Sequence, residues 1–171
     1  ILFGPFLVRL LFPTEPLPLP LLNRLKSLAA KERISFRKAY VWKTGARSIL
    51  NACVAGAVSF SRFILVTDAL LRTLNEEELE AVFAHELSHV RYRHFPLLVA
   101  FLSGFAALLL GGMGLLEGRI PPFCLLFLAT GSVAGFLVGP FARVSRILEL
   151  EADLGALRMG IPADYLIQAL R

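Results

Sequence analysis

Cysteine is scarce in this sequence, and its basic residues are not clustered. The 171 residues include two cysteines, Cys53 in a strand-like run and Cys124 in a membrane-like run, so no disulfide framework is implied. Lysine and arginine (18) outnumber aspartate and glutamate (13), which gives a net charge of +5. Because these basic residues form no stripe, they argue against nucleic acid as a partner and favour a positively charged rim facing a membrane.

Apolar residues are in excess instead. They make up 56% of the chain, and the mean hydropathy of +0.67 is well above that of ordinary soluble proteins. Residues 96–116 hold 21 residues without a charge and residues 120–142 hold another 23, separated by Glu117 and Arg119. Each run can cross a hydrocarbon core of about 30 Å as a helix. Two buried core helices would need a larger protein around them.

We therefore predict a transmembrane helical hairpin at about residues 96–142, inserted into the rest of the domain. Small residues in both runs predict close packing of the two helices against each other. These residues are Gly104, Gly111, Gly112, Gly131, Gly135 and Gly139.

The first 20 residues predict a membrane-proximal segment followed by a proline-rich linker. Residues 1–12 are too short to span a bilayer alone, so they either end a membrane helix or lie at the interface with Arg9 reaching water. Four prolines in residues 13–20 indicate an extended linker. Residues 21–171 are expected to form one domain. The chain begins at Ile1 and not at a methionine, so we expect a fragment of a longer protein.

The region before the apolar runs predicts an α+β fold with a small mixed sheet. Residues 21–32 have the periodicity of an amphipathic helix. Three strand-like runs follow, at residues 39–43, 49–55 and 63–67. A helix then opens at Asn75, with Glu78 three residues later as its capping-box partner. A last helix is predicted after Pro162.

Two of the three histidines lie in one short stretch, Ala84–His89, of the helix that opens at Asn75. Residues four apart share a helix face, so His85 and His89 can bind the same metal ion. Glu86 lies one step round the helix and can reach a water on that metal. This H-E-x-x-H spacing predicts a catalytic zinc site with Glu86 as general base. The alternative is a surface helix in which these motif residues occur by chance and bind no metal.

Catalytic zinc needs three protein ligands and one open position, so a third ligand must come from outside the motif. The helix predicted over residues 143–153 is rich in carboxylates. We prefer Glu149 to Glu151, because Asp153 lies one turn further on and can accept the N–H of a ligand histidine. A solvated helix face, with Arg146 as ion-pair partner, is an alternative that spacing alone leaves open.

Five short motifs occur in a fixed order within residues 38–170. They are Asn51–Gly56, Thr67–Leu71, Leu74–Leu79, Ala84–His89 and Ser145–Asp153. In this order they closely resemble the integral-membrane zinc metallopeptidases, the family of HtpX-type heat-shock proteases and CAAX prenyl proteases. The ordered set, HExxH followed by ExxxD, is far more specific than HExxH alone.

The resemblance implies a zincin-like, gluzincin-type domain with a small sheet, active-site helices and an inserted transmembrane hairpin. It implies one Zn²⁺ ion per chain, bound by His85, His89 and Glu149. It further implies that Glu86 is the catalytic base and that Asp153 accepts a hydrogen bond from the non-ligating nitrogen of a ligand histidine.

The resemblance also implies that the strand containing Asn51 and Ala52 binds the substrate backbone. Cys53 departs from the family pattern, in which an aromatic residue is common at this position. The expected activity is hydrolysis of peptide bonds in membrane or misfolded proteins, through a zinc-activated water, by a membrane-embedded endopeptidase. The alternatives are the peptidase domain of a membrane sensor-transducer that cleaves a regulator, and a non-catalytic membrane scaffold. Intact ligands and Glu86 argue against the scaffold.

The expected partners are a protein or peptide substrate and the lipid bilayer. Four arginines flank the apolar runs on the side that carries the catalytic residues: Arg91, Arg93, Arg143 and Arg146. An excess of basic residues marks the cytoplasmic side of membrane helices. We therefore expect an integral membrane protein whose active site faces the cytoplasm, and the resemblance to bacterial HtpX implies the inner (cell) membrane.

Overall fold

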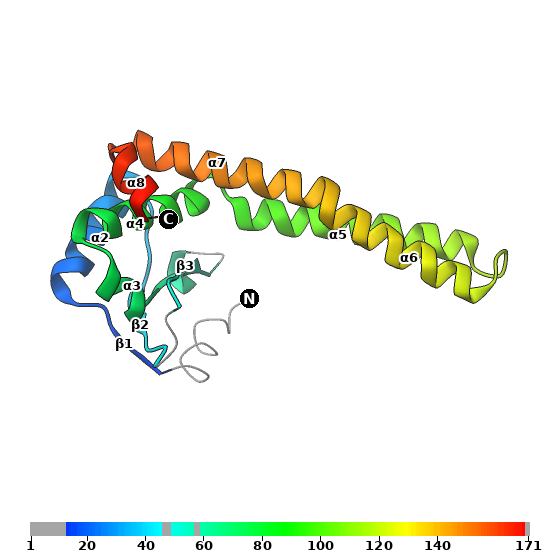
Figure 1. The fold of residues 1–171 in the computed structure, drawn as a ribbon, viewed down its shortest axis with the longest axis horizontal. Helices are drawn as coiled ribbons and strands as arrows, with labels where there is room; N and C mark the ends of the chain where they lie inside the picture. Colours follow the sequence, from blue (N-terminus) through cyan, green and yellow to red (C-terminus); the bar gives the residue numbers. More distant parts are fainter. Residues whose placement is uncertain (1–12, 46–48, 57–58, 170–171) are drawn as a thin grey trace. The chain divides into compact units, whose positions relative to one another are not determined.

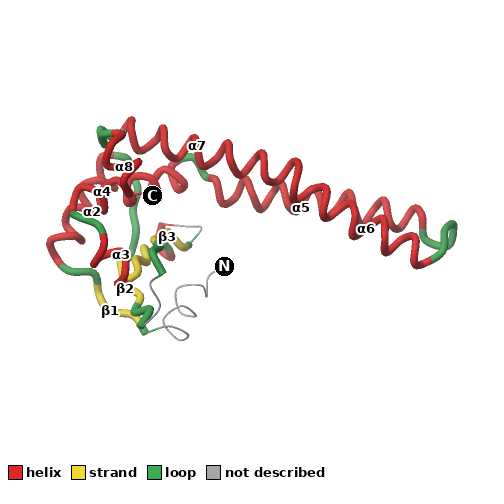
Figure 2. The backbone as a smooth tube through the Cα atoms, viewed as in Figure 1, coloured by secondary structure: helices red, strands yellow, loops and turns green. Residues whose placement is uncertain are grey.

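The computed structural model describes residues 13–45, 49–56 and 59–169 (Figures 1 and 2). The chain divides into two compact units, one formed by residues 1–93 with 151–171 and the other by residues 94–150. The predicted membrane-proximal segment at residues 1–12 lies outside the described residues and stays a prediction.

The first unit contains a four-stranded mixed sheet with the strand order β1-β2-β4-β3. Its strands are β1 (Thr14–Pro16), β2 (Lys38–Trp42), β3 (Ala52–Ala55) and β4 (Phe63–Thr67). The central strand β4 pairs parallel with β2 and antiparallel with β3. All five residues of β4 are buried, in keeping with its four apolar residues Phe63–Val66. The predicted small mixed sheet is confirmed.

Two details of the sheet correct the sequence-based expectations. The proline-rich stretch is no linker: β1 pairs antiparallel with β2, Leu17 after it is buried in the core, and Pro20 lies in the first turn of α2. Pro16 is tolerated because an edge strand leaves one side of its backbone unpaired, and Pro20 because the first helical turn has no partner for its N–H groups. The strand expected at residues 49–55 begins only at Ala52, and Ile49 and Leu50 are exposed.

Helices cover this sheet and complete the core of the first unit. α2 (Leu19–Lys31) buries Leu25, Leu28 and Ala29, in agreement with the predicted amphipathic helix. The short helix α3 (Asp68–Thr73) was not predicted and follows β4 directly. α8 (Ala163–Ala169) begins after Pro162, as expected, and contacts α4.

The motif helix α4 (Glu76–Arg91) is held at its start by the predicted capping box. The side chain of Asn75 accepts a hydrogen bond from the Glu78 N–H at 2.8 Å, and Glu78 Oε2 accepts one from the Asn75 N–H at 2.9 Å. Its apolar face is buried through Leu79, Val82, Phe83 and Leu87. A helix fixed at its first turn and along one face presents its other side chains in defined directions.

The second unit is a pair of apolar helical segments. α5 (His94–Leu116) is followed by a continuous helix, Pro122–Arg158, made of α6 (Pro122–Phe136), a π-helical turn (Leu137–Phe141) and α7 (Ala142–Arg158). From Glu151 onward, α7 belongs to the first unit. Both helices are long and apolar enough to cross a membrane, with mean hydropathies of 2.1 and 1.9 over their most apolar parts. Within those parts, 0% of the first helix and 6% of the second is buried. The predicted hairpin is therefore present as two candidate membrane helices.

Aromatic rings, not glycines, form the contact within the hairpin. Phe136 of α6 stacks on Phe105 of α5 with ring centroids 3.8 Å apart, and lies 5.1 Å from Phe101. A Cβ atom added at any of the six hairpin glycines named above would meet no atom within 4 Å. The expected glycine-mediated packing is therefore wrong: the glycines meet no neighbour, and the ring contacts between the helices gather around Phe136.

Candidate metal centre

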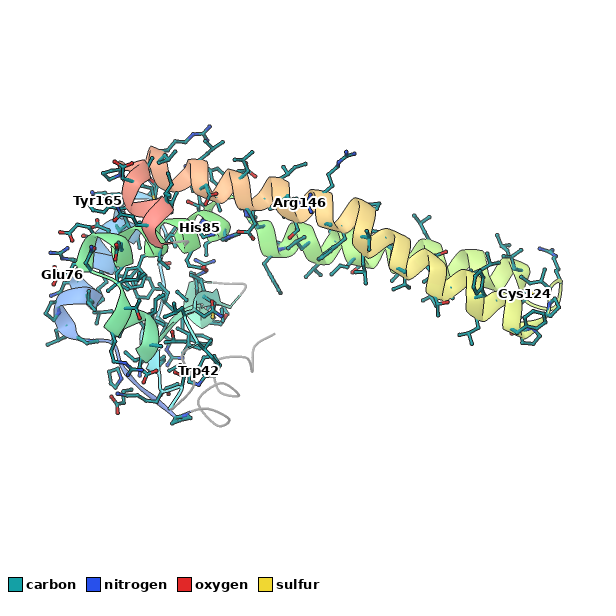
Figure 3. The ribbon with its side chains drawn as sticks, in the orientation of Figure 1. Trp42, Glu76, His85, Cys124, Arg146 and Tyr165 are labelled. Carbon is teal, nitrogen blue, oxygen red and sulfur yellow. The ribbon has the colours of Figure 1, made fainter. Side chains whose placement is uncertain are left out.

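Two histidines on α4 direct their ring nitrogens at each other. His85, labelled in Figure 3, is buried, and His89 one turn later is half-buried. Their Nε2 atoms lie 3.1 Å apart, and the ring planes meet at 73°. The predicted shared face of the two imidazoles is confirmed.

Asp153 fixes the orientation of the His85 ring through the nitrogen that does not face His89. Its Oδ1 lies 2.8 Å from Nδ1 of His85. A carboxylate can only accept a hydrogen bond, so Nδ1 of His85 carries the proton and donates it. In a neutral imidazole with this tautomer, Nε2 of His85 holds the lone pair, and Nε2 is the atom that faces His89. Asp153 lies in the C-terminal part of α7, which belongs to the same compact unit as α4.

The space between the two Nε2 atoms fits a metal ion. Two nitrogens bound to one tetrahedral zinc at 2.0–2.1 Å are about 3.3 Å apart, close to the observed 3.1 Å. The Asp153–His85 hydrogen bond is also the usual arrangement behind a zinc-bound imidazole. The two donor atoms and the hydrogen bond to Asp153 are thus compatible with metal binding by this pair.

Glu86 lies beside this pair and close to the edge strand β3. It is half-buried on α4, and β3 contacts α4. Burial raises the pKa of the Cys53 thiol, and the negative charge of Glu86 raises it further. The Cys53 thiol is therefore protonated near neutral pH and is a poor metal ligand. The contact between α4 and β3 brings this strand to the helix that carries Glu86.

Asn51 and Ala52 differ in the availability of their backbone groups. The Asn51 carbonyl accepts a hydrogen bond from the Thr67 N–H at 3.0 Å, and the Asn51 N–H donates to Thr67 Oγ1 at 3.1 Å. Antiparallel pairs alternate between hydrogen-bonded and non-hydrogen-bonded positions. Ala52 and Val54 therefore direct their N–H and C=O groups away from β4. Among the described strands, none pairs with that outer edge of β3.

Thr67, which the sequence places in the motif Thr67–Leu71 without a role of its own, connects two elements of this region. Besides its contacts with Asn51, its hydroxyl accepts a hydrogen bond from the Leu70 N–H at 3.3 Å and so caps α3. The available signal was a threonine at the end of a strand, directly before an aspartate in a first helical turn. Thr67 thus joins the start of β3 to the end of β4.

Glu149 lies on α7, four residues before Asp153, and is exposed. Because α7 is one uninterrupted helix from Ala142 to Arg158, Glu149 and Asp153 share a face, while Glu151 points to a different side. The helical spacing expected for the two carboxylates is confirmed.

Residues 20–171 match the model of peptidase family M48. The chain is 29% identical over 184 residues to a protease HtpX homolog of Thermoplasma acidophilum, an alignment that covers 99% of this chain and 56% of the relative. It is 31% identical over 182 residues to a protease HtpX homolog of Aeropyrum pernix, covering 94% and 54%. The chain thus spans about half the length of the curated relatives it matches.

A solved structure shares the fold. The crystal structure of S. mikatae Ste24p superimposes with a TM-score of 0.79 at 23% identity, covering 99% of this chain and 45% of that one. At this identity the likeness shows the fold alone.

Proposed function

The chain belongs to peptidase family M48, and from this premise we propose that it is part of a membrane-embedded, zinc-dependent endopeptidase. One observation carries the proposal. The Nε2 atoms of His85 and His89 face each other at 3.1 Å, while Asp153 holds Nδ1 of His85 at 2.8 Å. This pair is half of a catalytic zinc site, and it lies on the same helix turn as Glu86.

We take Glu149 as the third ligand of one zinc ion. Two histidines and a glutamate form a standard donor set for catalytic zinc, and among the described residues His85, His89 and Glu149 form a group that could hold a metal ion. Glu149 also shares its helix face with Asp153, whose carboxylate already contacts His85. Glu151 has no such relation to Asp153.

When bound, zinc supplies a Lewis acid that lowers the pKa of water to about 7 and polarises a scissile carbonyl. Glu86 then acts as general base: it removes a proton from the attacking water and delivers it to the leaving amine. Asp153 keeps His85 in the tautomer that presents Nε2 to the metal. Cys53, protonated beside Glu86, does not compete for either role.

The outer edge of β3 is the proposed substrate-binding element. A peptide in extended conformation can add to that edge through the N–H and C=O groups of Ala52 and Val54. The backbone of Asn51 is engaged by Thr67, so its exposed side chain is the group left to contact substrate. The contact between β3 and α4, the helix that carries Glu86, supports a scissile bond close to this strand.

The two apolar helices are the proposed membrane anchor, and the cytoplasmic face of the cell membrane (the inner membrane in a bacterium) is the proposed location of the zinc site. Arg91 and Arg93 precede α5, whereas the turn at the opposite end of the hairpin carries Glu117 and Arg119, one charge of each sign. This asymmetry follows the positive-inside rule.

The direct test uses the purified protein in detergent. Its zinc content is measured, and cleavage of an unfolded protein such as casein is followed before and after treatment with a chelator. We expect about one zinc per chain, loss of cleavage on chelation and recovery when zinc is restored. A protein that binds no zinc, or one whose cleavage survives full removal of metal, would contradict the proposal.

A further inference from the structure

The C-terminal part of α7 lies unusually close to α4 at Gly155. A Cβ atom added to Gly155 would collide with Ser88 Oγ and would lie 2.8 Å from both Ser88 Cβ and Tyr92 Cε2. Ser88 itself is fully buried, and so are Ala152 and Ala156, which share a face of α7 with Gly155. The two helices therefore meet through small residues, and Gly155 is where any side chain is excluded.

Neither neighbour of Gly155 is free to move aside at no cost. Ser88 Oγ donates a hydrogen bond to the Ala84 carbonyl at 2.9 Å, which fixes the direction of the hydroxyl along α4. The Tyr92 hydroxyl accepts a hydrogen bond from Arg158 Nη1 at 3.1 Å, which ties the ring to α7 itself. A methyl group at Gly155 would thus push the helices apart instead of only displacing a flexible side-chain end.

This contact is adjacent to the metal centre in sequence on both helices. Gly155 comes two residues after Asp153, and Ser88 stands between His85 and His89. From the same stretch of α7, Asp153 Oδ1 lies 2.8 Å from Nδ1 of His85.

We propose that Gly155 is a positioning residue of the metal centre: its lack of a side chain lets α7 approach α4 closely enough for Asp153 to hold His85. The inference rests on the proposed zinc-dependent function. Gly155 touches neither metal nor substrate and acts only through the Asp153–His85 hydrogen bond. Loss of a carboxylate behind a zinc-bound histidine typically weakens metal affinity about 10- to 100-fold, and Gly155→Ala is expected to do the same.

The test measures the zinc dissociation constant of the purified protein by competition with a chromophoric chelator. The variants are Gly155→Ala, Asp153→Asn, Ser88→Gly and the two doubles that combine Gly155→Ala with each of the others. Gly135→Ala is the matched control, because it makes the same change within a helix where no atom lies within 4 Å of the new methyl. It should bind zinc as the unmodified protein does.

Three results are expected together. Gly155→Ala weakens zinc binding about 10- to 100-fold. It causes little further loss once Asp153→Asn is present, because the hydrogen bond through which it acts is already impaired. Ser88→Gly, which removes two of the three clashing atoms, restores most of the affinity to Gly155→Ala.

Equal zinc affinity in Gly155→Ala and Gly135→Ala would overturn the inference. So would a loss of the same size with and without Asp153→Asn, because that result would indicate a general effect on the fold. If Gly155→Ala alone is not recovered folded, Ser88→Gly is compared with the double variant. Equal zinc affinity in Ser88→Gly and in the double variant Gly155→Ala/Ser88→Gly then supports the inference. A double variant that does not fold, or that binds zinc more weakly than Ser88→Gly, overturns it. Failure of the unmodified protein to bind zinc would instead count against the proposed function.

Discussion

Asp153 accepts a hydrogen bond from Nδ1 of His85 at 2.8 Å, across 68 positions of sequence. The apolar helices lie between these two residues in the chain, yet both residues belong to the same compact unit. The chain therefore leaves this unit, forms the hairpin and returns to the same place. A return of this kind requires an even number of membrane crossings, which two candidate helices satisfy.

Glu86→Gln is expected to keep zinc and to lose peptide hydrolysis by about 100- to 10,000-fold, the usual contribution of a general base. Glutamine preserves the size of the side chain but cannot take a proton from water. Metal analysis and casein cleavage on the same sample provide the measurement. Glu77→Gln, an exposed position on the same helix, is the control and should leave both unchanged. Near-normal cleavage by Glu86→Gln would exclude its role as base.

Glu149→Ala is expected to lose zinc, whereas Glu151→Ala should retain it. The two carboxylates are two residues apart on α7, and only Glu149 shares a face with Asp153. Each variant serves as the control for the other, because both remove one carboxylate from the same helix. Zinc content after gel filtration is the measurement. The reverse result would mean that a different face of α7 supplies the ligand.

Asp68 is expected to make the stability of the protein sensitive to acid. Its carboxylate accepts hydrogen bonds from the Thr44 N–H at 3.0 Å, the Thr44 hydroxyl at 2.7 Å and Arg72 Nη1 at 2.8 Å. These interactions, that with the Thr44 backbone first, hold the pKa of Asp68 well below its usual range. Because the folded-state pKa lies below the unfolded value of about 3.9, the stabilisation is fully present above that pH and is lost as the pH falls toward the folded value.

The thermal midpoint in detergent, measured between about pH 7 and pH 3, tests this expectation. Asp68→Asn should lower the midpoint at neutral pH, and its difference from the unmodified protein should shrink below about pH 4. Thr44→Val, which removes only the hydroxyl, should reproduce part of the loss. A difference that stays constant with pH would show that the charge of Asp68 does not stabilise the fold.

The orientation of the hairpin is testable with single cysteines in a background without Cys53 and Cys124. Glu117 lies exposed in the hairpin turn and Glu77 lies exposed on α4, so a cysteine at either position is accessible to a reagent. A membrane-impermeant maleimide added to intact cells should label Glu117→Cys and not Glu77→Cys. After the membrane is opened, both should react. Labelling of Glu77→Cys alone in intact cells would place the zinc site outside.

Features that depend on near neighbours in the chain were predictable from the sequence. The capping box of α4 and the shared face of His85 and His89 follow from spacings of three and four residues in a helix. The buried strand β4 and the two apolar helices follow from runs of apolar residues with no charge to interrupt them. Each of these signals is contained in one segment, so no knowledge of the rest of the fold was needed.

Features that depend on distant parts of the chain were decided only by the tertiary structure. The pairing of β1 with β2, the engagement of the Asn51 backbone by Thr67 and the outward direction of the hairpin glycines all result from where other elements lie. Periodicity shows that a glycine or a carboxylate shares a helix face, but it does not show what that face meets. The sequence thus determined which side chains can form a zinc site, whereas the packing of α7 on α4 decided that Asp153 reaches His85 and that Gly155 admits no side chain. The physical reason is that helix geometry is set by local backbone bonds, while the distance between two helices is set by the side chains that meet between them.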